Sequence, residues 1–305
     1  MDAANLVILE QRRYENIATF QDSLRQVNRK VVAQFSSSGA PWSPGFFNDV
    51  TWSTQGKGLA TSSPLPIIHS STGKLWGFQP NLHAYVNGTL AQQPTLKQDS
   101  DGEYYAEFDG VDDNYAGITN SAGWTQDALT LPAGLTTSIG GADFPSTQWL
   151  GNITIFVVMA IRSSVTPGFI WGRNNNAIGA GRISMASSGG MKFRAFQWFS
   201  AGMMTTTGAT TIPVSTRTIL SARFSSSATN GIKQEIFVNG TLDGSTVTGH
   251  PITSSSGRSQ LGGSGIDGTL PMDYYNMIFY PYALDDDSMK VITRYFGKRY
   301  GITVP

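Results

Sequence analysis

The fold of this chain is decided between residues 103 and 116, Glu103-Tyr-Tyr-Ala-Glu-Phe-Asp-Gly-Val-Asp-Asp-Asn-Tyr-Ala116. The stretch begins as an aromatic-rich run, and aromatic residues are enriched in β-strands. It continues into Asp109-Gly110, a pair typical of tight turns, because glycine accepts positive φ and aspartate bonds nearby backbone amides. The acidic group Asp112-Asp113-Asn114 follows before the chain becomes extended again. We therefore predict a strand, a tight turn and a second strand.

The composition favours a β-sandwich over a helical enzyme. The chain has 305 residues, of which 34 are glycine and only 14% are charged, a profile that suits many short strands joined by tight turns. Lys plus Arg and Asp plus Glu number 21 each, so no net charge attracts nucleic acid or an anionic membrane. The absence of cysteine excludes disulfides, thiolate metal sites and cysteine nucleophiles.

Further strands are expected in the second half of the chain. Residues 153–161 are apolar on both faces, as a buried central strand is. Residues 191–199, 218–224 and 234–238 are also predicted to be strands. The last of these runs into Asn239-Gly240, which favours a type I′ hairpin because both central residues of that turn need positive φ.

The C-terminal segment, residues 283–301, predicts a short helix. Its first residues are acidic, which stabilises a helix N-terminus, and it closes with basic residues and a glycine, which are typical of a helix C-terminus. The predicted buried stripe of this helix consists of Met289, Ile292, Phe296 and Tyr300.

Three motifs in this chain resemble one family. Phe108-Asp-Gly-Val-Asp-Asp113 is similar to the first hairpin of laminin-G-like, concanavalin A-type jelly rolls, especially those of bacterial and phage surface proteins. Tyr280-Pro-Tyr-Ala-Leu284 and Lys298-Arg-Tyr-Gly301 resemble the C-terminal turn and helix of the same domains. The resemblance covers about residues 70–303. It implies an all-β fold, an antiparallel jelly-roll β-sandwich over residues 67–305 closed by the short C-terminal helix, and it says little about function.

Residues 1–36 are predicted to form a long α-helix outside that domain. Apolar residues recur there at alternating three- and four-residue spacing, the a/d pattern of a coiled coil. These residues are Ile17, Phe20, Leu24, Val27 and Val31. We expect them to assemble the chain into a homo-oligomer, with a trimer as the leading expectation, or to dock it onto a larger assembly. The alternative is an amphipathic helix packed on its own sandwich.

Residues 37–66 differ from both neighbouring parts of the chain. They are rich in Ser, Gly and Pro, a composition typical neither of a helix nor of a regular sheet. They also carry aromatic residues that a free linker would lack, namely Trp42, Phe46, Phe47 and Trp52. We therefore expect an ordered, extended arm that lies on its own domain or on a neighbour.

The acidic residues around the turn are the best candidates for catalysis, but their set is incomplete. Glu107 and Asp109, at i and i+2, share one strand face, as do the carboxylates of laminarinase-type glucanases on this fold. Those enzymes use an E-x-D-x-x-E pattern, whereas Glu107-Phe-Asp109-Gly-Val-Asp112 lacks the final Glu. We therefore expect no enzyme and assign no catalytic residue. Asp109 and Asp112 are better explained by bonds to the backbone amides of the turn.

The same acids, together with Asn114, are the candidates for a calcium site, because Ca²⁺ takes oxygen ligands at short spacing. No D-x-D-x-D-G loop is present in the sequence. The three histidines, His69, His83 and His250, also lack metal-ligand spacing. We expect no metal and no cofactor, with calcium as the alternative.

Aromatic and amide side chains are the candidates for glycan binding, since a ring can stack on a sugar and an amide can bond its hydroxyls. The candidate residues are Trp171, Asn174, Asn175, Trp198, Tyr274 and Tyr275. The alternative is that the rings fill the core of the sandwich.

These observations predict a non-enzymatic structural or adhesive protein on the exterior of a tailed-phage virion, such as a fibre, spike or head-decoration subunit. Residues 1–16 lack the basic start and the long apolar run of a signal peptide, which fits assembly in a host cytoplasm. No apolar stretch approaches the ~20 residues of a membrane span. The helix would hold other virion proteins, and the sandwich would contact host-surface glycans. The alternative is a glycan-cleaving or glycan-binding bacterial protein on the same fold.

Overall fold

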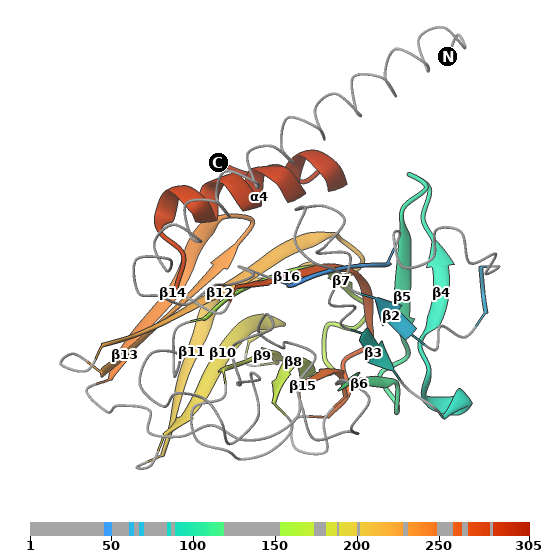
Figure 1. Ribbon diagram of the computed structural model, residues 1–305, viewed down its shortest axis with the longest axis horizontal. Coiled ribbons are helices and arrows are strands. Elements are labelled where there is room, and N and C mark those ends of the chain that lie inside the picture. Colours follow the sequence, from blue (N-terminus) through green and yellow to red (C-terminus); the bar gives the residue numbers. More distant parts are fainter. Residues whose placement is uncertain are drawn as a thin grey trace, which may run out of the picture.

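The computed structural model contains two antiparallel β-sheets and a C-terminal helix (Figure 1). Among the residues that it describes, no helix is long and apolar enough to cross a membrane. The described residues are 46–50, 61–63, 67–69, 84–86, 89–118, 153–173, 181–187, 189–199, 202–227, 231–248, 259–263, 268–280 and 283–305.

Among the described residues, the first sheet, sheet A, has eight strands, and one of them, β1 (Phe46–Asp49), pairs with β16 outside the main order. The main order is β14 (Thr241–Thr248), β13 (Gly231–Val238), β12 (Thr218–Ser227), β7 (Ile153–Ile161), β16 (Met272–Tyr280), β5 (Tyr104–Phe108) and β4 (Thr95–Gln98).

A short 3-10 helix (Leu90–Gln92) precedes strand β4 of sheet A along the chain. The second sheet, sheet B, also has eight strands in the part of the chain that the structure describes. Its order is β11 (Gly202–Thr211), β10 (Lys192–Phe199), β9 (Gly181–Ala186), β8 (Gly168–Arg173), β15 (Ser259–Gly262), β6 (Asn114–Ile118), β3 (Ala84–Val86) and β2 (Ile67–His69).

The main core lies between the two sheets. Phe108 of sheet A and Tyr115 and Phe193 of sheet B are among its fully buried side chains. Strand β7 is buried from Thr154 to Ile161, which confirms the predicted central strand. Alternate residues of β7 face this core, and the others face away from it, so a second cover is needed on the outer side of sheet A.

Helix α4 (Asp286–Tyr300) provides that cover, lying across the outer face of sheet A (Figure 1). The Asp285 side chain caps the helix by accepting a hydrogen bond from the Ser288 amide at 2.8 Å, and Gly301 ends it with a φ of 66°. The Phe296 ring lies 6.4 Å from the ring of Phe156 on β7. The predicted stripe is confirmed, since Met289, Ile292, Phe296 and Tyr300 are all buried.

The turn after β5 carries the chain from sheet A to sheet B. Strand β5 pairs with β16 and β4, whereas β6 pairs with β15 and β3. The strand, the turn and the second strand are present as predicted, but a hairpin is wrong here because the two strands belong to different sheets. Gly110 has a φ of 81°, and a Cβ at this residue would lie 2.7 Å from the Pro271 side chain. The turn therefore requires glycine for its conformation and for its packing.

Two other predictions from the sequence have clear outcomes. Asn239 and Gly240, with φ of 48° and 85°, form the predicted hairpin between β13 and β14. The prediction that residues 37–66 contain no regular sheet is wrong at β1, where Phe46 and Phe47 lie in register opposite Phe279 and Ile278 of β16. Long-range pairing, which composition does not encode, makes this segment a strand.

The structure tests the remaining fold predictions in part or not at all. The predicted helix over residues 1–36, with Ile17, Phe20, Leu24, Val27 and Val31, lies outside the described residues. The chain is mostly β, with two antiparallel sheets and a C-terminal helix. The jelly-roll topology of these sheets stays a prediction.

Candidate functional site

The aromatic rings predicted to bind glycan are core residues where the structure describes them. Trp171 is 2% exposed, Tyr274 is 0% exposed and Tyr275 is 4% exposed. These rings cannot stack on a sugar in this structure, because protein atoms already cover them. The sequence showed the rings but not which strand face each one occupies. The other predicted contacts, Asn174, Asn175 and the Trp198 side chain, lie outside the described residues.

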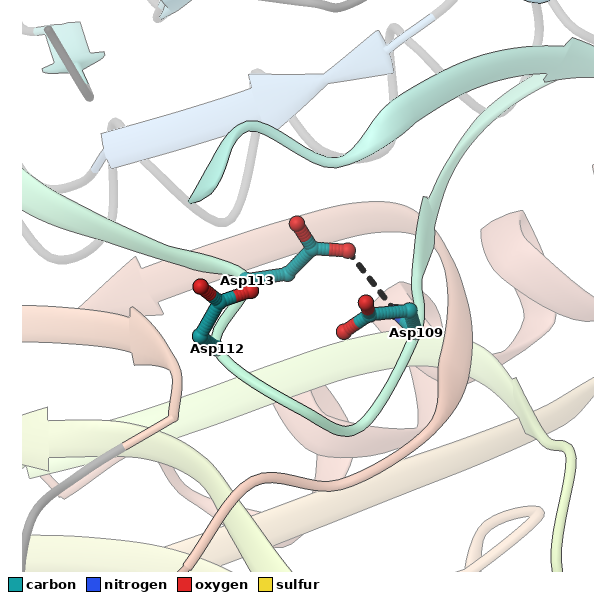
Figure 2. A group of neighbouring side chains, drawn as sticks. All are labelled: Asp109, Asp112 and Asp113. Atoms are coloured by element: carbon teal, nitrogen blue, oxygen red, sulfur yellow. Dashed lines mark hydrogen bonds between the residues drawn. The ribbon is translucent and has the colours of Figure 1, made fainter. Parts of the chain in front are cut away.

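The acidic turn, defined as Asp109, Asp112 and Asp113, brings one carboxylate oxygen of each residue within 4.8 Å of the others (Figure 2). Asp113 accepts a hydrogen bond from the Asp109 amide at 2.8 Å, and Asp109 accepts one from the Val111 amide at 2.7 Å. Burial raises the pKa of Asp113 to about 6, and the charges of Asp109 and Asp112 act in the same direction. Asp109 and Asp113 thus hold the turn with their own oxygens, as predicted for Asp109, whereas no such side-chain bond is found for Asp112.

This carboxylate set is of the type that calcium prefers, since all its donors are oxygens. Two of its members, Asp109 and Asp113, already accept hydrogen bonds from backbone amides of the turn, so these carboxylates serve the turn itself. The acidic turn therefore fits its structural role better than the role of a metal centre, and we derive no chemistry from a metal there.

A second group of polar residues lies on the outer face of sheet A, and we call it the outer-face cluster. It consists of Asp99, Asp101, Tyr105, Glu107, Arg162, Arg217, Asp273 and Tyr275. Its centre is a row across three strands, in which Ala160 of β7 lies opposite Asp273 of β16, and Asp273 lies opposite Glu107 of β5. Directly opposed residues have Cβ atoms about 4.5–5.5 Å apart, so the two carboxylates are neighbours.

Arg162, just after β7, binds both of these carboxylates. Its Nη1 lies 3.2 Å from Oε2 of Glu107, and its Nε lies 3.6 Å from Oδ1 of Asp273. The side chains of Arg162, Glu107 and Asp273 are 40%, 23% and 18% exposed, respectively. The trio is therefore half-buried on the sheet and reachable from solvent.

Arg217, just before β12, forms the matching contacts on the other side of the cluster. It pairs with Asp101, and its Nη1 lies 3.4 Å from Oδ2 of Asp99. The other oxygen of Asp99 accepts hydrogen bonds from the amides of Asp101 and Glu103, at 2.9 and 3.0 Å. Asp99 thus shapes the turn between β4 and β5 and orients Arg217 at the same time.

Two tyrosines join these ion pairs. The rings of Tyr105 and Tyr275 lie 5.2 Å apart, and the Arg217 guanidinium lies 5.8 Å from the centre of the Tyr275 ring. Tyr275 also packs edge-on against Tyr300 at a ring distance of 5.7 Å, so the cluster begins where α4 ends. Tyr105 remains partly exposed, and it is the ring in the cluster that a ligand could reach.

The electrostatics of the cluster follow from burial and from the carboxylates that gather there. Burial raises the pKa of Asp273 to about 6; the charge of Glu107 adds to this rise, and Arg162 opposes it. Burial also raises the pKa of the Tyr105 hydroxyl, with further contributions from Asp273 and Glu107. Chemically, the cluster offers hydrogen-bond acceptors, an exposed guanidinium and an aromatic ring on rigid strands.

The sequence identified two members of this cluster as candidates, Glu107 for catalysis and Tyr275 for glycan binding. The sequence groups Glu107 with Asp109 as an incomplete catalytic set, whereas the structure places Glu107 beside Asp273 and puts Asp109 in the turn. The alternation of Tyr105 and Glu107 with the buried Ala106 and Phe108 is a signal of a polar outer face. No local pattern could have indicated that Asp273, from β16, would lie opposite.

Comparisons with known proteins give distant structural likenesses. No family model matches the sequence, and no curated protein matches it. Trypanosoma rangeli sialidase in complex with sialic acid is 10% identical, with a TM-score of 0.47, over 81% of this chain and 32% of that chain. This chain therefore spans about a third of the length of those sialidase chains.

Two further solved structures are comparably distant. The Ruminococcus gnavus IT-sialidase CBM40 bound to alpha2,3 sialyllactose is 14% identical, with a TM-score of 0.39, over 47% of this chain and 83% of that chain. The binding domain of Botulinum Neurotoxin DC in complex with SialylT is 10% identical, with a TM-score of 0.46, over 76% of this chain and 51% of that chain. At this distance, neither a family nor a function is transferred to this chain.

Proposed function

We propose that this chain is a non-enzymatic glycan-binding β-sandwich and that the outer-face cluster is its contact surface. The observation that carries the proposal is the arrangement of Glu107, Arg162 and Tyr105, which place an acceptor, a donor and a partly exposed ring side by side. A sugar presents hydroxyls that both donate and accept hydrogen bonds and C–H faces that stack on rings. The cluster matches these two properties in one place.

The rigidity of the cluster supports a binding role. Glu107 and Asp273 sit in register on paired strands whose alternate residues, Phe108 and Met272, are buried in the core. Arg162 is held by two carboxylates at once. A preorganised surface loses little conformational entropy when a ligand binds, which favours affinity.

The same contacts argue against hydrolysis. A glycosidase needs one carboxyl group that donates a proton and another that attacks the sugar or activates water. Here the Arg162 guanidinium contacts both Glu107 and Asp273, so each carboxylate already serves as the partner of a cation. We therefore propose binding without cleavage.

A binding site of this kind could serve on a phage particle or in a bacterial protein. We retain the virion exterior as a proposal from the sequence, in which residues 1–36 anchor and oligomerise the chain. It predicts that the chain is found in purified particles and that deleting residues 1–36 removes it from them. Binding by such an assembly would gain strength from many copies.

A binding screen with variants tests the proposed site. The full chain is screened on immobilised glycans, and hits are measured by calorimetry with the wild type, Arg162→Met and Tyr105→Ala. We expect each variant to weaken binding by about tenfold or more, which is about 1.4 kcal/mol. Lys290→Met is the matched control, because Lys290 is 63% exposed on α4 and pairs with Asp287, outside the cluster. Unchanged affinity in both cluster variants, with the fold intact by circular dichroism, would show that the site is elsewhere.

A further inference from the structure

We propose that the outer-face cluster selects glycans that carry a free amino group and rejects anionic glycans. This inference rests on the proposed function and adds the charge class of the ligand. It is carried by the way in which each charged group of the cluster already lies against a group of opposite charge.

Both guanidinium groups of the cluster are engaged by carboxylates. Arg162 contacts Glu107 and Asp273, and Arg217 contacts Asp99 and Asp101. A sugar hydroxyl needs one donor of a guanidinium, whereas bidentate recognition of a sugar carboxylate needs two parallel donors. An anionic sugar would therefore have to share Arg162 or Arg217 with the protein carboxylates that already contact them. Anion binding at the cluster is therefore disfavoured.

The balance of charge points in the same direction. The four carboxylates of the cluster outnumber its two arginines. Among the described residues, Lys97 of β4 lies in register opposite Tyr105, and even with Lys97 included the carboxylates remain in excess. The buried pair of Glu103 and Arg299 beside them adds no net charge. A cationic group is therefore attracted to this surface, and an anionic group is repelled.

The partly exposed ring supplies a second reason for a cation. Tyr105 and Glu107 alternate along β5 and lie on the same face, so the ring and the carboxylate border one position. An ammonium group at this position would contact the face of the Tyr105 ring and would also form an ion pair with the Glu107 carboxylate. The Asp273 carboxylate is opposite Glu107, and a bound cation would offset the repulsion between these two groups.

The test compares oligosaccharides of equal length and different charge. Calorimetry with the full chain measures a glucosamine oligomer, its N-acetylated form and a galacturonic acid oligomer at neutral pH. We expect the glucosamine oligomer to bind at least about tenfold more tightly than its acetylated form and the galacturonic acid oligomer to bind most weakly. Glu107→Gln keeps the oxygen acceptor but removes the charge, so it should reduce the preference for the amine to about threefold or less.

A matched variant separates this site from a general effect of charge. Asp287→Asn removes a carboxylate that is 87% exposed on α4, outside the cluster, and should leave the amine preference unchanged. Tighter binding of the galacturonic acid oligomer, or an equal loss of preference in Asp287→Asn and Glu107→Gln, would overturn the inference and leave the proposed function standing. Binding to no glycan of any charge would overturn the proposed function itself.

Discussion

Replacing Asp113 by asparagine is expected to stabilise this protein at neutral pH and to have little effect in mild acid. Burial raises the pKa of this carboxyl to about 6 from 3.8; the Asp109 amide opposes the rise, and the charges of Asp109 and Asp112 add to it. Because the folded state holds this proton more tightly than the unfolded state does, protonation stabilises the fold. The free energy of unfolding therefore falls as the pH rises from about 4 through about 6.

The size of the effect follows from the shift in pKa. A change from 3.8 to about 6 is worth about 3 kcal/mol, at 1.36 kcal/mol per pKa unit. Asparagine imitates the protonated carboxyl and can still accept the hydrogen bond from the Asp109 amide with its own side-chain oxygen. The rise to about 6 already includes the opposing effect of this amide bond, so the bond is not counted again. We thus expect Asp113→Asn to be more stable than the wild type by up to about 3 kcal/mol above pH 7.

Urea denaturation of both proteins, at several pH values between about 4 and 8, measures this difference. A chelator in every buffer keeps divalent cations from offsetting the repulsion in the acidic turn. Asp287→Asn, on the exposed surface of α4, is the control and should follow the wild type at each pH. If the gain in Asp113→Asn is the same at the lowest and highest pH, or if the variant is less stable at neutral pH, the reasoning about the buried carboxyl fails.

Two further predictions concern the packing of α4. Phe296 lies on the buried side of α4, with its ring 6.4 Å from the Phe156 ring. Phe296→Ala should lower the free energy of unfolding, measured in urea, by about 3–5 kcal/mol. A loss below about 1 kcal/mol would contradict the role of α4 as the cover of sheet A. Glu103→Gln leaves the buried Arg299, 3.2 Å away, without its carboxylate and should lower the free energy of unfolding by about 3–5 kcal/mol. Asp287→Asn, which breaks the exposed pair with Lys290, should leave the free energy of unfolding nearly unchanged. Equal effects of the two changes would refute the importance of burial.

Local patterns in the sequence predicted the elements that depend on local physics. Strand β7 is apolar on both faces, and both faces are covered. The pair Asn239-Gly240 needs only its own φ angles to form the hairpin. Helix α4 carries its caps, Asp285 and Gly301, within its own sequence. In each case the residues that determine the structure are neighbours in the chain.

The rest depends on which segments meet, and that information is distributed over the whole chain. The local sequence around Gly110 would be the same whether the next strand pairs with β5 or crosses to the other sheet. The contact between Gly110 and Pro271 forms only in the folded protein, so the local sequence does not reveal it. Trp171 and Tyr274 have the same appearance in a sequence whether they point inward or outward, and both point inward. Glu107 lies opposite Asp273 of β16, and no sequence motif identifies Asp273 as its neighbour.

The helix that completes the core also determines which part of the outer face of sheet A carries polar residues. The outer face over β7 is apolar and must be covered, and α4 covers it up to Tyr300, which packs on Tyr275. Beyond that contact, the outer face changes to Asp273, Glu107 and Arg162, while alternate residues on the same strands remain in the core. Because the two faces of a strand are independent, charges in the cluster can change without a change in the core. If the cluster binds glycans as proposed, its ligand preference can therefore change while the core of the sandwich beneath it stays the same.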